Sequence, residues 1–496
     1  MLSSESYSIP SELMADHKFT FIDLFAGIGG FHHALSSLGG ECVLACEFDA
    51  EAQQVYRAAF PELRDDQFVS NIRSVTRSVI DDENALLTDA EIRKRVPKHD
   101  VLCGGFPCQP FSKSGAQLGV QDKTRGTLFF DIMQIIRARE PRFVMLENVR
   151  NLAGPRHTET WAVIIASLRD AGYRVSDTPV VLTPHLVPSE HGGAPQARDR
   201  VFILAERIET AAERKRGEVH SAAGKRSTPL LTRDYFADGH DPDEWRVADL
   251  LLPDNAISNV GSYRLSVAEQ SYLDAWDYFV RNIETDDLPG FPIWVHAFHE
   301  EADIPEGCPD WKRNFLIKNA DFYCRHRAFL DDWLGMEWGP ERKVVSQFPF
   351  SRQQFEWQAR KHHPTAQDRT ISDLVLQMRP SGIRVKPPTY LPALVAITQT
   401  SIVGPGVLPG IEHYRRLTPE EAAKLQGIPH EPFAKAGVDE AAAYKQLGNA
   451  VNVGVVTLAF RALAGEALLG KGEGAPARPP TVEAQVELDF DLDTGS

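Results

Sequence analysis

A cysteine between two prolines is the residue best suited to covalent chemistry. Cys108 lies between Pro107 and Pro110, just after the apolar run Asp100–Gly104. The loop at the carboxyl end of a strand is where open α/β sheets bind ligands, and the prolines restrict the backbone around the thiol. An isolated cysteine is usually a small buried hydrophobe. In this context it indicates a nucleophile that acts as its thiolate.

Carboxylate and guanidinium groups follow at other predicted strand ends. Glu147 ends the apolar run Arg142–Glu147 and should project over the same sheet edge as the thiol, where it could act as a general acid. Gln196, Arg198 and Arg200 precede or begin a further strand and would share one side of it. Two ordinary alternatives stay open: a capping or ion-paired Glu147, and a surface ladder of ion pairs at the arginines.

A glycine-rich turn joins the first predicted strand to the first predicted helix. It contains Gly27, Gly29 and Gly30, whose spacing differs from the dinucleotide G-x-G-x-x-G pattern. Glycines there let a ligand approach the backbone, and the helix N-terminus favours polar or anionic groups. Glu47 ends the second strand, where a carboxylate can accept ribose hydroxyls. Together they favour a nucleoside cofactor over a merely tight turn.

Alternating apolar runs and helical patterns predict a parallel sheet with helices on both faces for residues 19–206. The predicted strands are Phe19–Phe25, Glu41–Glu47, Asp100–Gly104, Arg142–Glu147, Tyr173–Leu182 and Arg200–Ala205. The predicted helices are Gly30–Leu38, Ala50–Ala59, Leu128–Arg139 and Glu159–Ala171.

The rest of the chain changes character twice. From about 207 to 410 no strand–helix repeat is visible, which indicates a second, irregular domain. Regularity returns with a helix start at Thr418, where Pro419 and Glu421 fit the first turn and the capping box. A last helix is expected over Val451–Leu468, followed by an acidic tail that is expected to be disordered.

Composition limits the class of protein. The chain has 496 residues and a net charge of −16, no apolar run long enough for a membrane span, and a polar N-terminus unlike a signal peptide. We expect a cytoplasmic protein. Its six cysteines show no zinc spacing, so we expect no metal. Nine basic and three acidic residues lie between Arg342 and Lys386, which is compatible with DNA binding or with a solvated face.

The ordered motifs resemble the DNA cytosine-5 methyltransferase family. They are DLFAGIGGF from Asp23, Glu47, GGFPCQPFS from Gly104, RGTLFFDI from Arg125, ENV from Glu147, QARDR from Gln196, RRLTPEEAAKLQGIP from Arg415 and YKQLGNAV from Tyr444. The resemblance covers roughly residues 19–206 and 412–468, and eight motifs in order are far more specific than any one of them.

The resemblance implies a doubly wound α/β fold that binds S-adenosylmethionine, with a second, irregular target-recognition domain. The implied organisation is a first catalytic part over 1–206, a recognition domain over 207–411, a return to the catalytic domain over 412–469, and a disordered acidic tail over 470–496.

The resemblance also implies residue roles. Cys108 would attack the target base, Glu147 would contact its N3 and amino group, and Arg198 its O2, with Arg200 beside them. The residues implied at the cofactor are Phe25, Gly27, Gly29, Gly30, Glu47, Phe48, Asn71, Ile72, Pro107, Leu128, Asn449 and Val451. Those expected at DNA are Ser112, Gln196, Arg379, Arg384 and Lys386, the last three on a loop favoured by the surrounding prolines and glycine.

One residue departs from the family pattern. Asn71 stands where the family commonly has aspartate. An asparagine oxygen still accepts a hydrogen bond from the adenine amino group, so we expect weaker cofactor binding.

Three other functions fit the sequence less well. A tRNA cytosine-5 methyltransferase is disfavoured by a recognition segment of nearly 200 residues. A non-catalytic DNA-binding regulator is disfavoured by the joint presence of Cys108, Glu147 and Arg198. A nicotinamide dehydrogenase is disfavoured by the glycine spacing.

The partner that the resemblance implies is double-stranded DNA, so we expect nucleoid association. The expected state is a monomer without membrane association. The early position of the Asp23 motif leaves no room for N-terminal chromatin-reading domains and favours a prokaryotic enzyme. Such an enzyme would belong to a restriction-modification system, with a cognate restriction endonuclease that acts separately, or would be solitary.

Overall fold

The apolar runs of the first 207 residues form one sheet in the computed structural model. The structure describes residues 18–78, 85–107, 128–209, 231, 240–284, 288–360, 362–363, 369–396 and 401–470. Cys108, Ser112 and the tail expected from 470 on, apart from Gly470 itself, lie outside the described residues.

The large sheet has eight strands in the order β3-β2-β1-β4-β5-β9-β6, with β7 paired to β9. Its strands are β1 (Phe19–Leu24), β2 (Gly40–Cys46), β3 (Phe68–Val69), β4 (Val101–Gly105), β5 (Phe143–Val149), β6 (Tyr173–Val175), β7 (Val180–Leu182) and β9 (Arg200–Arg207). The first five are parallel, and β9 runs antiparallel to β5, β6 and β7.

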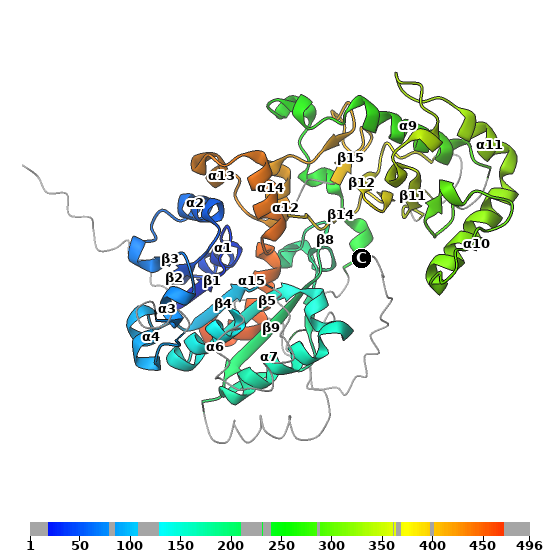
Figure 1. Cartoon of the computed structure of the whole chain (residues 1–496). Coiled ribbons are helices and arrows are strands. Elements are labelled where there is room, and N and C mark those ends of the chain that lie inside the picture. The colour runs from blue at the N-terminus through cyan, green and yellow to red at the C-terminus, as the bar shows by residue number, and fades with distance from the viewer. Residues whose placement is uncertain are drawn as a thin grey trace, which may run out of the picture.

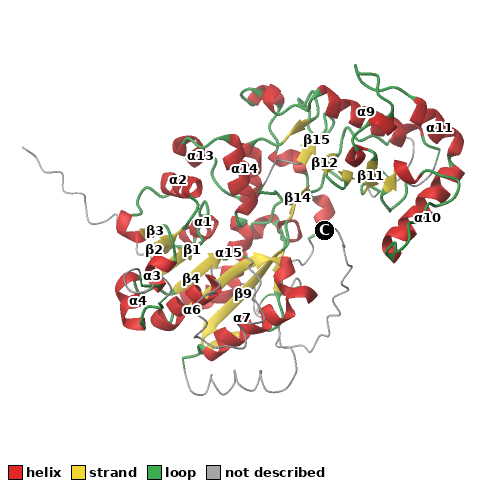
Figure 2. Ribbon diagram, viewed as in Figure 1, coloured by secondary structure: helices red, strands yellow, loops and turns green. Residues whose placement is uncertain are grey.

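Helices cover both faces of this sheet (Figure 1, Figure 2). They are α1 (Gly30–Ser37), α2 (Ala50–Ala59), α3 (Arg73–Thr76), α4 (Asp89–Arg95), α6 (Leu128–Arg139) and α7 (Thr158–Asp170). One apolar cluster joins the sheet to α1 and α2, and a second joins its other face to α4, α6 and α7. The predicted doubly wound α/β fold is therefore confirmed.

One predicted strand was wrong. The run Tyr173–Leu182 is interrupted, so that β6 and β7 are separate strands on β9. The break contains Ser176 and Pro179, and the Ser176 hydroxyl accepts the amide of Thr178 at 3.0 Å. A side-chain turn of this kind competes with the ladder.

The region expected to be irregular contains a second sheet of six strands in the order β10-β11-β13-β12-β15-β16. Its strands are β10 (Ile293–Trp294), β11 (Gln354–Trp357), β12 (Val375–Arg379), β13 (Gly382–Lys386), β15 (Ser401–Val403) and β16 (Arg415–Arg416). The helices α9 (Val267–Asn282), α10 (Asp310–Arg325) and α11 (Arg327–Gly335) share one apolar core with it. A separate pair, β8 (Gln196–Ala197) with β14 (Leu391–Pro392), links the two regions.

The chain then returns to the large sheet through α12 (Pro419–Gln426), α13 (Glu431–Ala436), α14 (Glu440–Asn449) and α15 (Val453–Ala464). The predicted capping box is confirmed: the Thr418 hydroxyl accepts the Glu421 amide at 3.2 Å, and the Glu421 carboxylate accepts the Thr418 amide at 2.8 Å. In Figure 1 these C-terminal helices lie beside the blue N-terminal elements, and α15 packs into the core beneath α1.

The last predicted helix starts two residues later than expected, because Asn452 caps α15 by accepting the amide of Val455 at 3.0 Å. Among the described residues, the stretch Glu440–Ala464 is long and apolar enough to cross a membrane. Of its most apolar window 67% is buried within the fold, and the break between α14 and α15 interrupts it. It is a pair of core helices.

Candidate active site

The strand order reverses between β1 and β4, since β2 and β3 extend the sheet to one side and β5 to the other. The carboxyl ends at such a switch point leave a crevice where open α/β sheets bind ligands. Two loops emerge there. Residues 25–29 follow β1, and Phe106 and Pro107 follow β4.

The loop after β1 has an uncommon backbone. Phe25, Gly27 and Gly29 have φ of 56°, 55° and 89°. A left-handed phenylalanine costs of order 1–3 kcal/mol, and such strain gathers at ligand sites. A Cβ on Gly27 would meet nothing within 4 Å, so the loop leaves open space. A Cβ on Gly29 would come within 2.3 Å of the Phe60 ring, which explains glycine there.

Glu47 faces this loop from the end of β2. Its carboxylate accepts the amides of Gly27 at 2.8 Å and Asp49 at 2.7 Å. The next residue, Phe48, has a side chain that is 77% exposed. The exposed Phe48 ring offers a flat apolar surface, and the Glu47 carboxylate beside it can accept hydrogen bonds from hydroxyl groups of a ligand.

The C-terminal helices close the other side of the loop. A Cβ on Gly30 would lie 2.7 Å from both the carbonyl oxygen and a side-chain carbon of Val451, so these backbones touch. Asn449 is exposed at the end of α14. Lys445 of α14 pairs with Asp49 at 2.7 Å. Residues more than 400 positions apart in the chain thus border the same crevice.

The remaining cofactor candidates lie around α3 and α6. The Asn71 side-chain oxygen accepts the amide of Arg73, the first residue of α3, at 3.0 Å, and Ile72 is buried. Leu128 begins α6. Asp131 of α6 is fully buried and accepts the Thr76 hydroxyl at 2.9 Å.

Glu147 lies at the edge where β4 ends. It is paired in register with Gly105, and its Oε2 is 3.0 Å from where a Gly105 Cβ would stand. Arg200 approaches Glu147 with an Nε–Oε1 distance of 2.8 Å. Burial raises the pKa of Glu147, while Arg200 and then Arg198 oppose that rise. A raised pKa suits a carboxyl group that must deliver a proton near neutrality.

Arg198 has a different environment. It is 2% exposed, and its guanidinium donates to the carbonyl oxygens of Gly448 at 2.8 Å, Ala450 at 2.7 Å and Leu394 at 3.2 Å. Gln196 is fully buried in β8, and its side-chain amide has no hydrogen-bond partner among the described residues. Of Gln196, Arg198 and Arg200, it is Arg200 that forms an ion pair with Glu147. Their expected common strand is absent, because β8 ends at Ala197 and β9 begins at Arg200.

The three basic residues expected at DNA lie in a β-hairpin rather than the predicted loop. Arg379 ends β12 and Arg384 and Lys386 belong to β13. Arg384 pairs with Glu356 of β11 at 2.8 Å, and Lys386 donates to the Gln358 side chain at 2.6 Å. The predicted loop was wrong because Pro380 and Ser381 form a two-residue turn, and Gly382, at φ 124°, is already paired with Arg379 at the start of β13.

Two contributors to the site were missed by sequence reasoning. Asn148 donates to the Phe106 carbonyl at 2.8 Å and so fixes the loop that leads into Pro107. Asp131 fixes α6 against α3. Asn148 belongs to the family-like motif ENV and Asp131 to RGTLFFDI, so membership in these motifs could have marked both residues as part of the site. Their partners are distant in the chain and could not be read from it.

The comparisons with known proteins agree with this arrangement. The model of the C-5 cytosine-specific DNA methylase family matches residues 19–464. The chain is 40% identical over 510 residues to the type II methyltransferase M.AluI of Cellulosimicrobium cellulans, which covers 89% of this chain and 91% of that protein. It is 41% identical over 189 residues to the type II methyltransferase M.HpaII of Haemophilus parainfluenzae, covering 38% of this chain and 46% of that one.

Among solved structures, the S. pombe Dnmt2 methyltransferase aligns over 90% of this chain and 98% of its own, with 16% identity and a TM-score of 0.45. The family match extends over nearly the whole described chain and includes every motif that borders the crevice. The chain therefore belongs to the C-5 cytosine-specific DNA methylase family.

Proposed function

We propose that the chain methylates C5 of a flipped-out cytosine in duplex DNA, with Cys108 as the nucleophile. The enzyme class, a DNA (cytosine-5-)-methyltransferase dependent on S-adenosylmethionine, follows from family membership. The observation that supports the residue roles is the placement of Glu147. Its carboxylate lies beside Gly105 at the end of β4, and the chain reaches Cys108 three residues later.

The crevice has features that fit the cofactor. The open loop at Gly27, the Glu47 carboxylate and the exposed Phe48 ring suit a backbone-lined pocket, a ribose acceptor and an adenine platform. We assign Phe25, Gly29, Gly30, Asn71, Ile72, Pro107, Leu128, Asn449 and Val451 to the same pocket. Bound S-adenosylmethionine would supply an electrophilic methyl group. Because the Asn71 side-chain oxygen already accepts the Arg73 amide, an adenine amino group at this position would share that acceptor.

The protein side chains act on the base. The Cys108 thiolate adds to C6 while the Glu147 carboxyl donates a proton to N3, and this makes C5 a nucleophilic enamine carbon. After C5 has gained the methyl group, loss of the C5 proton to a base expels the thiolate, and N3 returns its proton to the Glu147 carboxylate, which restores the ring. The cytosine must leave the duplex first, at a cost of a few kcal/mol.

We propose different roles for Arg198 and Arg200. We assign the contact to the base to Arg200, because it already lies against Glu147. Arg198, for which the sequence suggested the O2 contact, is instead proposed to hold the corner between α14 and α15 through its bonds to Gly448 and Ala450.

We propose the chain organisation expected from the sequence: a catalytic part over 1–206 and 412–469, a recognition domain over 207–411, and a tail over 470–496. We further propose a cytoplasmic monomer acting on double-stranded DNA in a restriction-modification system beside a separate endonuclease. The names of the type II relatives support that setting. The alignment with M.AluI covers 89% of this chain and therefore extends into the proposed recognition domain. We propose that the two proteins share a target sequence.

Cys108→Ser tests the central assignment. A hydroxyl is far less acidic than a thiol, so methyl transfer to duplex DNA should be lost while S-adenosylmethionine binding persists. Cys42→Ser, at a buried cysteine of β2, is the control. Near-wild-type turnover in Cys108→Ser would refute the role. Bisulfite sequencing of DNA from expressing cells identifies the target, and tRNA offered in parallel tests the RNA alternative.

A further inference from the structure

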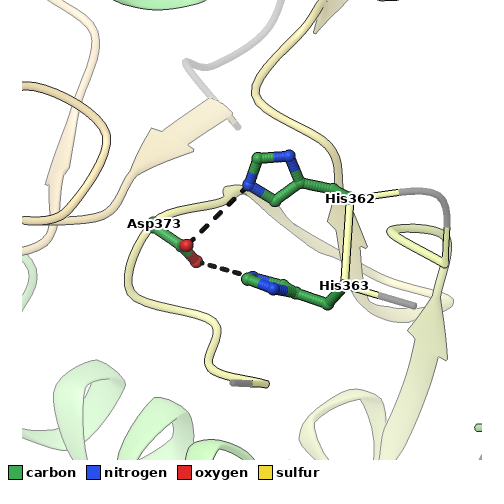
Figure 3. Close-up of side chains that lie close together, drawn as sticks. All are labelled: His362, His363 and Asp373. Atoms are coloured by element: carbon green, nitrogen blue, oxygen red, sulfur yellow. Dashed lines mark hydrogen bonds and ion pairs between the residues drawn. The ribbon is translucent and has the colours of Figure 1, made fainter. Parts of the chain in front are cut away.

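Three side chains of types that can ligate a metal lie close together in the second sheet region, apart from the active site. His362, His363 and Asp373 offer two imidazole nitrogens and a carboxylate, with ligand atoms all within 4.8 Å of one another. Figure 3 shows both rings directed at the same carboxyl group. We call this trio the His–Asp cluster.

The backbone presents both rings to one side. The amides of His362 and His363 donate to a single acceptor, the Ala359 carbonyl, at 3.1 and 3.0 Å. This tight turn follows β11 directly, and the His363 ring stacks on Trp357 of that strand, with 6.2 Å between centroids. The position of His363 is therefore set by the strand.

Asp373 is held independently. It precedes β12, and its neighbour Ser372 accepts the Gly406 amide at 2.9 Å while donating its own amide to the Thr370 hydroxyl at 3.1 Å. A Cβ on Gly406 would lie 2.9 Å from the Asp373 Cβ, so the loop after β15 packs against this residue. The carboxylate is fixed from a different part of the chain than the two rings.

The spacing suits coordination better than hydrogen bonding alone. The Nε2 of His363 lies 3.0 Å from Oδ1 of Asp373, a hydrogen-bond distance. The Nε2 of His362 lies 3.8 Å from Oδ2, which is too long for one. Tetrahedral ligands at bonds of ~2.0–2.1 Å stand roughly 3.3 Å apart, which both distances approach.

We propose that the His–Asp cluster binds one divalent transition-metal ion, Zn²⁺ by its donor set, with water completing the coordination. The expectation of no metal rested on cysteine spacing and did not consider this cluster. The ion would join the segment after β11 to the segment before β12. Since β13 lies between those two strands, the ion would brace the sheet that carries Arg384 and Lys386.

The test uses the full-length chain without a histidine tag, stripped with chelator and dialysed against micromolar Zn²⁺. We expect roughly one equivalent bound and a higher Tm than the stripped protein. His362→Gln and Asp373→Asn should each lower the affinity at least tenfold and abolish the Tm gain. His413→Ala, at an exposed histidine outside the cluster, is the matched control.

Co²⁺ separates the possible ligands. Its visible spectrum in the wild type should be that of nitrogen and oxygen ligation, and it should vanish in His362→Gln. A sulfur charge-transfer band would assign the metal to cysteines and overturn the proposal. So would an absence of bound metal in the wild type, or equal affinity in wild type and His362→Gln. If Asp373→Asn fails to fold by circular dichroism, the exposed His362 position decides the result. Metal content is measured without methyl transfer, so failure here leaves the proposed function standing.

Discussion

At the scale of single residues, the spacing of Glu147, Arg198 and Arg200 in the sequence predicts that they lie near the site but not which contacts each one makes. The sequence indicated a carboxylate at a strand end and arginines two residues apart, and the family resemblance implied that Arg198 contacts O2 of the base, with Arg200 beside it. In the fold, Arg200 meets Glu147 at the crevice while Arg198 is buried against carbonyl oxygens. The difference arises because a strand boundary falls between them.

Glu147→Gln should reduce kcat by about 10²-fold or more, the usual scale for losing a general acid. S-adenosylmethionine affinity should barely change, because Glu147 lies on the side of the crevice near β4. Single-turnover methylation and cofactor titration check both. A collapse of cofactor affinity at an unchanged single-turnover rate would instead assign Glu147 to the cofactor site.

The pH dependence of kcat tests the same carboxyl group. A general acid works only in its protonated form, so activity falls as the pH rises through its pKa. Arg200 lowers the pKa of Glu147 against the larger effect of burial. In Arg200→Ala that opposition is removed, and we expect the alkaline limb to move to higher pH as the overall rate falls. If the alkaline fall in kcat stays at the same pH in Arg200→Ala, or moves to lower pH, a group other than Glu147 determines it.

At the scale of elements, Arg198 connects three segments of backbone. Its bonds to Gly448 and Ala450 bracket Asn449, the cofactor candidate at the end of α14. In Arg198→Lys one ammonium cannot reproduce these bonds, each worth ~1.5–3 kcal/mol as hydrogen bonds to a charged group. We expect the Kd for S-adenosylmethionine to rise roughly tenfold or more by calorimetry. Arg200→Lys is the control. If Arg198 contacts the base, cofactor affinity will stay constant and only kcat will fall.

The β12–β13 hairpin is the element to test for DNA binding. If Arg384 binds a phosphate group, Arg384→Ala should weaken binding to all duplexes and lower the salt slope by about one unit. If Arg384 binds a base edge, the change should cost ~1–3 kcal/mol on the cognate duplex and relax specificity at one position. Titrations against cognate and scrambled duplexes at several salt concentrations separate the two, with the exposed Arg64→Ala as control. If Arg384→Ala and Arg379→Ala both bind as wild type, the hairpin lies outside the interface.

At the scale of the whole molecule, predictability follows the length and apolar character of each strand. The strands β1, β2, β4 and β5 are mostly apolar runs of five to seven residues in a parallel sheet, so sequence alone locates them to within two residues. The second sheet joins two-residue strands such as β10 and β16 to partners far along the chain. Strands that short leave no period to detect, so this sheet was expected to be irregular.

A buried ionic junction joins the two sheet regions. Arg415 is fully buried at the start of β16, and its guanidinium meets Glu421 of α12 at 2.8 Å and Asp254 at 3.1 Å. It also donates to the Leu252 carbonyl at 2.7 Å. The segments that enter and leave the second sheet region thus meet at one side chain, and Glu421 adds the capping box of α12.

Glu421→Gln should therefore destabilise the protein by up to about 3–5 kcal/mol, because it removes the nearer of the two carboxylates that compensate the buried Arg415 charge and leaves Asp254 alone against it. Arg415→Met removes the positive charge but leaves Glu421 and Asp254, so it should also be destabilising. The double variant Arg415→Met/Glu421→Gln should lose less than the sum of the single changes if the two side chains act as one unit. Denaturant unfolding of all four proteins completes the cycle. Lys424→Ala/Glu420→Ala, at an exposed pair on the same helix, is the control and should cost at most about 1 kcal/mol. Strictly additive losses at Arg415 and Glu421 would show that the junction stabilises each segment separately and does not couple the two regions.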